Sequence, residues 1–258
     1  MVRIKKLMDK YLLTMRIVLF ALITFYLYPI TVKSQRHYQL NDTLYVWSMQ
    51  GAPIYEEADN PGSKIKTYYY GEAARVVDTK IDKHKDNRYI GKDFKFSGAM
   101  VKVIMQKDTG YVYDGYLSAL RPLNPRSGNR GIQLLEASFG KEPVVTEKTR
   151  TSNGQQGEKS VSEYGKNIRY VKELKGNCTV ETFTLNNVRL NGAYYFMMTV
   201  YSNYFLKDAD SIEEPDFTQN ARGKYYFTVK SGAERKRITI QKSGNTYEVS
   251  SFECELPE

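Results

Sequence analysis

The chain has 258 residues with 38 basic and 29 acidic side chains, a formal net charge of +9, and 41% hydrophobic residues. This composition is that of a folded globular protein and excludes a disordered, a collagen-like or a multi-span membrane protein. Tyrosine is abundant, with 22 copies, and favours half-exposed β-sheet surfaces. We therefore expect an all-β fold in one or two small domains.

The first 34 residues have the pattern of a secretory signal. Basic residues precede an apolar run that is shorter than the roughly 20 residues of a membrane-spanning helix. Val32 and Ser34 suit the −3 and −1 positions of a cleavage site. We predict cleavage between Ser34 and Gln35 and export to the periplasm or the exterior. An uncleaved anchor is the alternative, and either Met1 or Met15 can be the start.

Most of the net charge belongs to this signal. Residues 1–34 contain six basic residues and one acidic residue, so the mature chain carries only +4. Nucleic-acid binding would need a concentrated basic face, which is not expected here. We also expect no stable membrane span in the mature chain.

Short apolar runs separated by Gly, Pro and Asn follow the signal. They alternate with a period of two and lie at 44–47, 52–55, 73–77, 100–104 and 110–113. Runs of this length with turn residues between them predict a small antiparallel barrel. We assign it to residues 35–122.

Three segments of this region resemble the bacterial Src-homology-3-like (SH3b) domain: Met100-Val-Lys-Val103, Thr109-Gly-Tyr-Val112 and Tyr116-Leu-Ser118. The resemblance spans about residues 44–120 and implies an SH3-like barrel. Where the family has a tight turn, this chain inserts a charged segment, 79–97, which we expect to be a hairpin exposed to solvent.

The resemblance also implies a ligand, namely peptides or peptidoglycan stem peptides bound in a groove of aromatic side chains. The candidate ligand-binding residues are Tyr55, Tyr69, Tyr113 and Tyr116. The alternative is that Tyr116 fills the core and the other three are scattered over the surface.

Residues 123–166 predict a domain boundary, a short helix at 132–139 and a polar linker at 141–166. Residues 167–258 predict a second antiparallel β-meander domain, either a sandwich or a barrel. Within it, Asn191-Gly192 is a strong signal for a hairpin turn and 193–201 for a central strand.

The second domain offers little catalytic chemistry. Cys178 and Cys254 are the only cysteines, and in an exported chain they predict a disulfide. The only histidines, His37 and His84, precede this domain, so the sequence supports neither a thiol protease nor a zinc site. The acidic residues at 208–216 lack calcium-loop spacing and predict a solvated loop. We expect no catalytic residues, metal or cofactor.

These features predict a non-catalytic exported binding or scaffolding protein of the bacterial cell envelope. Its expected partner is a peptide, peptidoglycan or an envelope protein. Two alternatives stay open: an envelope hydrolase with a carboxylate-only site in the C-terminal domain, and a subunit that assembles with a partner.

Overall fold

The structure of the protein is a computed structural model. It describes residues 38–79, 85–124, 131–141, 143–150, 156–202, 206–208, 211–212, 215–219, 223–231 and 234–254. The predicted signal and cleavage site lie outside these ranges. Among the described residues, no helix has both the length and the hydrophobicity to cross a membrane.

The first sheet contains eight antiparallel strands. They are β1 (Thr43–Val46), β2 (Ala52–Tyr55), β3 (Lys64–Tyr68), β4 (Ala73–Asp78), β5 (Lys85–Tyr89), β6 (Lys95–Met105), β7 (Asp108–Tyr113) and β8 (Leu117–Ser118). The strand order is β3-β2-β7-β6-β4-β1-β8, and β5 pairs with β6 outside this path. Two 3₁₀ turns, η1 (Pro61–Ser63) and η3 (Asp114–Tyr116), complete the region.

Alternate side chains of these strands fill one interior. In β6, for example, Val101, Val103 and Met105 are buried while Lys102 between them is not. Buried side chains from seven of the strands join a single apolar cluster that includes Leu44, Ile54, Val76 and Val112. The period-two pattern of the sequence therefore corresponds to the inward face of the sheet.

The second sheet is also antiparallel and has the order β15-β16-β17-β18-β12-β11-β10-β9. Its strands are β9 (Val145–Arg150), β10 (Gln156–Tyr164), β11 (Ile168–Lys175), β12 (Cys178–Asn186), β15 (Asp216–Gln219), β16 (Lys224–Ser231), β17 (Glu234–Ser243) and β18 (Thr246–Cys254). A separate two-stranded ladder joins β13 (Leu206–Asp208) and β14 (Ser211–Ile212). The expected all-β class is confirmed.

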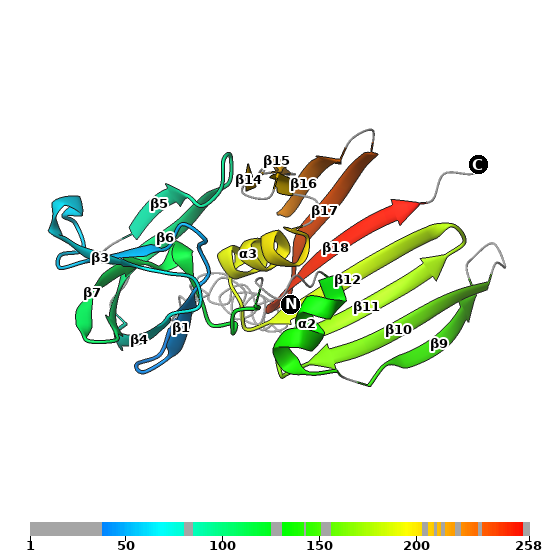
Figure 1. Ribbon diagram of the computed structural model, residues 1–258, viewed down its shortest axis with the longest axis horizontal. Coiled ribbons are helices and arrows are strands. Elements are labelled where there is room, and N and C mark those ends of the chain that lie inside the picture. The colour runs from blue at the N-terminus through cyan, green and yellow to red at the C-terminus, as the bar shows by residue number, and fades with distance from the viewer. Residues whose placement is uncertain are drawn as a thin grey trace, which may run out of the picture. The chain divides into compact units, whose positions relative to one another are not determined.

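Two helices, α2 (Gly131–Phe139) and α3 (Leu190–Val200), contact each other and the second sheet (Figure 1). The short helix expected at 132–139 is confirmed by α2. The hairpin expected at Asn191-Gly192 and the strand expected at 193–201 are wrong, because both belong to α3.

Burial on every side explains the error at α3. Nine of its eleven residues are buried, and a short run that is apolar all round does not distinguish a buried strand from a buried helix. Gly192 serves close packing instead of a turn, since a Cβ atom there would lie 2.6 Å from the Ser118 hydroxyl oxygen in β8.

The polar linker expected at 141–166 is also wrong, because most of this stretch forms β9 and β10. These strands have few apolar side chains but complete backbone ladders, with β10 pairing with both β9 and β11. Lys159 and Glu173 face each other across β10 and β11 at 3.7 Å. Strand pairing and cross-strand charges thus order a segment that has little to bury.

The charged insertion at 79–97 does form a hairpin, built by β5 and the start of β6. It is not simply solvated, because its tip carries Ile90 and Phe94, which are both buried. The ring of Phe94 lies 4.8 Å from that of Tyr194 in α3 and 5.5 Å from that of Phe227 in β16. The tip therefore joins a core that the first sheet shares with the second.

The predicted disulfide is present. Cys178 in β12 and Cys254 in β18 are direct cross-strand partners with Cα atoms 4.0 Å apart, and they form a bond across 76 positions of sequence.

Candidate functional site

A small depression of about 200 Å³ opens on the first sheet, between the segment that follows β2 and strand β5. Its walls combine an aromatic ring, a thioether and apolar loop residues with several charged groups. The lining residues are Tyr55, Ala58, Asp59, Asn60, Pro61, Lys85, Asp86, Arg88 and Met100. We call this depression the Tyr55 cavity.

The loop wall of the cavity is held by its own hydrogen bonds. The Gly62 amide donates to the Asn60 side-chain oxygen at 2.9 Å, which caps η1. The Glu56 amide donates to the Ser63 carbonyl at 2.9 Å and so closes the loop at its base. Such local side-chain and backbone bonds give the loop one defined conformation.

Tyr55 is positioned by a close approach of two strands. Gly110 in β7 lies against the Tyr55 backbone, where a Cβ atom would clash with the Tyr55 carbonyl oxygen. Only glycine allows β2 to pair with β7 at this distance. The glycine of the Gly-Tyr-Val segment thus places a wall of the cavity.

Arg88 forms the inner end of the cavity. Its Nε atom lies 2.6 Å from the Asp86 carboxylate, and its guanidinium lies over the Tyr113 ring, 5.0 Å from the ring centroid. Burial lowers the pKa of Arg88, but the Asp86 carboxylate and hydrogen bonds to Tyr55 and Tyr116 outweigh burial and raise its pKa above the ordinary value. The cation is therefore fixed and largely satisfied by this chain.

The structure brings three of the four candidate tyrosines together around Arg88. Tyr55 lines the cavity, and the rings of Tyr113 and Tyr116 lie 5.3 Å apart. Tyr69 is not among the lining residues; it lies in the turn between β3 and β4 with 64% of its surface exposed. The tyrosines are thus neither a single exposed groove nor fully scattered.

Tyr113 does not have the surface position that ligand contact requires. It is 0% exposed, and its hydroxyl donates to the Phe96 carbonyl at 2.5 Å and accepts from the Arg88 amide at 3.3 Å. Burial raises the pKa of Tyr113 to about 12. This residue supports Arg88 from beneath and takes no direct part in the cavity wall.

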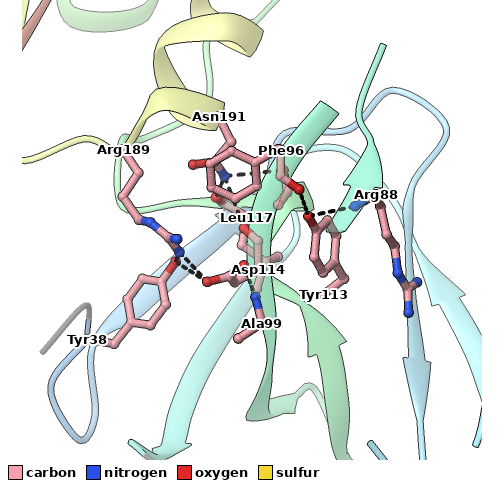
Figure 2. Close-up of polar contacts among 10 residues, drawn as sticks. Tyr38, Arg88, Phe96, Ala99, Tyr113, Asp114, Leu117, Arg189 and Asn191 are labelled. Atoms are coloured by element: carbon pink, nitrogen blue, oxygen red, sulfur yellow. Dashed lines mark hydrogen bonds and ion pairs between the residues drawn. The ribbon is translucent and has the colours of Figure 1, made fainter. Parts of the chain in front are cut away.

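A buried polar network centred on Asp114 lies next to Tyr113 (Figure 2). The Asp114 carboxylate is 0% exposed and accepts the Ala99 amide at 2.9 Å, the Tyr38 hydroxyl at 3.4 Å and a guanidinium hydrogen of Arg189. Arg189 precedes α3, so this ion pair links α3 to the first sheet.

Asn191 makes the second link between α3 and the first sheet (Figure 2). Its side-chain amide donates to the carbonyls of Asp114, Gly115 and Leu117 at 3.0, 3.2 and 2.6 Å. These carbonyls belong to η3 and β8, so the amide clamps the end of the first sheet to the helix. Sequence analysis assigned Asn191 to a turn and missed this role.

Sequence analysis placed Asp86 and Arg88 in the charged insertion and Met100 in the Met100-Val-Lys-Val103 segment, but it assigned none of the three to a binding site. Within β5, Asp86 and Arg88 are half-buried and alternate with exposed neighbours, which is the one local signal available. The residues that Arg88 contacts outside β5 come from β2, β6, β7 and η3, and no local pattern specifies such a meeting.

Comparisons with family models, with curated proteins and with solved structures find no match to this chain. Among the described residues, no group of three or more His, Cys, Asp or Glu side chains is arranged to hold a metal ion.

Proposed function

We propose that the protein is an exported, non-catalytic binding module of the bacterial cell envelope that recognises short peptide segments at the Tyr55 cavity. The observation that carries the proposal is that one cavity combines the apolar side chains of Tyr55 and Met100 with charged groups, including Arg88. Concave sites that bring apolar side chains together with convergent polar groups are typical ligand sites.

The placement of tyrosines on the first sheet supports this proposal. The first sheet places Tyr55 and Tyr116 so that both meet one cation, Arg88, and this arrangement suits the SH3-like ligand site that the sequence resemblance implies. Aromatic rings provide contact area at little cost in conformational entropy. At about 200 Å³ the cavity suits a short segment better than a large ligand.

The disulfide is compatible with export. Disulfides persist in oxidising compartments and are rare in the cytosol, and Cys178 and Cys254 are bonded. Cleavage after Ser34 can be tested by N-terminal sequencing of protein from the envelope fraction. A chain that keeps its first 34 residues there would contradict cleavage and favour the anchor.

Binding can be tested by co-sedimentation with purified peptidoglycan sacculi. We expect Tyr55→Ala to weaken binding about tenfold, as truncation of a central aromatic contact does. Tyr69→Ala is the matched control, because it removes an exposed tyrosine that does not line the cavity. Equal binding by both variants would contradict the assigned site, and absence of wild-type binding would contradict peptidoglycan as partner.

The same sacculi distinguish binding from hydrolysis. A binding module leaves the supernatant free of soluble muropeptides, whereas time-dependent release that is proportional to protein concentration would favour the hydrolase.

A further inference from the structure

A strip of side chains continues from the Tyr55 cavity across the first sheet. Tyr55 in β2 is the direct cross-strand partner of Tyr111 in β7, and Tyr111 is the partner of Lys102 in β6. Direct partners in antiparallel strands project to the same face. The three side chains, which we call the aromatic strip, therefore form one row on the surface of the sheet.

The row is flanked by a lysine on each side, because Lys64 in β3 is the cross-strand partner of Tyr55 and Lys102 is the partner of Tyr111. At the cavity end, the guanidinium of Arg88 is already paired with Asp86. At the other end, the Nζ atom of Lys102 lies 5.6 Å from the centroid of the Tyr111 ring. No carboxylate among the described residues lies within ion-pair distance of Lys102. Lys102 is half-buried, and its ammonium group lies near the Tyr111 ring on the face that carries the row.

We propose that the aromatic strip binds an extended peptide whose carboxylate pairs with Lys102 while a preceding side chain enters the Tyr55 cavity. The inference rests on the proposed function and adds Lys102 and Tyr111 to the site. Tyr111 supplies the ring beneath the peptide, and Lys102 selects its charge.

The dimensions of the strip fit a short peptide. Adjacent strands lie about 4.8 Å apart, so three residues in a row across β2, β7 and β6 span roughly 10 Å. An extended peptide covers that length with about three residues at 3.3 Å each. A tripeptide can therefore reach from the cavity to Lys102.

A carboxylate suits this end better than a phosphate. Lys102 offers a single positive charge at this end of the row, which matches a monoanion better than a dianion.

Three soluble peptides test the proposal by NMR titration of the isotope-labelled protein. They are N-acetyl-trialanine with a free carboxylate, N-acetyl-trialanine amide, and an N-acetyl tripeptide amide with aspartate in the middle. We expect the free carboxylate to bind about two- to fivefold more tightly than the amide, the range for one exposed ion pair. The aspartate peptide distinguishes a side-chain carboxylate from a terminal one.

Variants locate the effect. Lys102→Gln should abolish the difference between acid and amide, while Lys107→Gln, an exposed lysine in the turn after β6, should keep it. Tyr111→Ala should weaken all three peptides. Equal affinity of acid and amide for the wild type, or a preference that survives Lys102→Gln, would overturn the proposal. If Tyr55→Ala still binds sacculi more weakly than wild type in that case, the proposed function is supported and only the carboxylate subsite at Lys102 is contradicted.

Discussion

The two sheets bury their apolar side chains in different ways. The first sheet encloses its own apolar cluster, to which almost all its strands contribute. The second sheet is open, and its inner face is covered by α2, α3 and side chains of the first region, including Trp47, Phe94 and Leu120. The region that contains the first sheet (residues 38–124, the first region) has an internal core. The region that contains the second sheet (residues 131–254, the second region) is buried partly by side chains of the first region.

Because of this difference, we expect some substitutions to change the stability of the fold without changing ligand binding, and others to do the reverse. The internal cluster of the first sheet includes neither Tyr55 nor Met100, so changes at the Tyr55 cavity leave that cluster intact, although Met100 is buried in the core shared with the second sheet. The open sheet, by contrast, should respond to any change in the residues that cover it. The following variants test that asymmetry, from the largest expected effect to the smallest.

Phe94→Ala should separate the two regions most clearly. Phe94 is 2% exposed and packs against four aromatic rings of the second region. Its truncation should lower the free energy of unfolding by about 3–5 kcal/mol, the usual cost for a buried phenylalanine. Hydrogen exchange should accelerate in β16–β18 and remain slow in β1 and β4.

Tyr89→Ala is the control for this variant, because Tyr89 lies in the same hairpin but is 62% exposed. It should leave the free energy of unfolding within about 0.5 kcal/mol of wild type. Equal acceleration of exchange in both sheets of Phe94→Ala would show that the regions share one cooperative core.

The ion pair of Asp114 and Arg189 should show an asymmetric response. Arg189→Met leaves the fully buried Asp114 carboxylate without its cation, which costs about 3–5 kcal/mol. Asp114→Asn leaves Arg189, whose side chain is 25% exposed, in contact with water and should cost about 1–3 kcal/mol. Urea unfolding of both variants checks this order, and the reverse order would contradict the account.

Removal of the disulfide should affect the second sheet alone. Replacement of Cys178 and Cys254 together by serine frees a loop of 76 positions and should cost about 2–4 kcal/mol. Proteolysis should then cut the second region first, while the Tyr55 cavity keeps its affinity. An equal loss of peptide binding would indicate coupling between the two sheets that the internal cluster of the first sheet does not predict.

Alkaline pH should give the most gradual effect, spread over the window between pH 10 and 12. Because burial raises the pKa of Tyr113 from 10 to about 12, its stabilising contribution is full below pH 10 and is lost as the pH rises toward 12. One such proton contributes a slope of about 1.4 kcal/mol per pH unit in that window. Tyr113→Phe should reduce the slope of urea stability against pH by about this amount. An unchanged slope would place the loss in other tyrosines.

The sequence predicted best where a pattern was local. Alternation in 100–104 identified the inward face of β6, and the count of two cysteines identified the disulfide. It failed at α3, whose apolar residues face neighbours on every side, and at β9 and β10, whose order comes from paired backbones instead of buried side chains. The candidate tyrosines were partly informative, because Tyr55, Tyr113 and Tyr116 do meet.

Arg88 shows why the site itself could not be predicted. It contacts residues that lie between 2 and 33 positions away in sequence, on β2, β5, β6, β7 and η3. Only the fold brings these residues together, and the spacing of Arg88, Tyr55 and Tyr116 in the sequence does not reveal that their side chains meet. A charged residue in an insertion resembles any solvated lysine or arginine until its neighbours are known.

The position of β18 sets the order in which the second sheet can form. β18 is the latest described strand in the chain, yet it lies in the middle of the sheet between β17 and β12. A ribosome or a translocon delivers residues 246–254 after every other strand of this sheet. Until then β9–β12 and β15–β17 are two separate ladders with no strand to join them. The sheet can therefore be completed only after synthesis or transport has passed Cys254, when β18 pairs with both β17 and β12 and joins the two ladders.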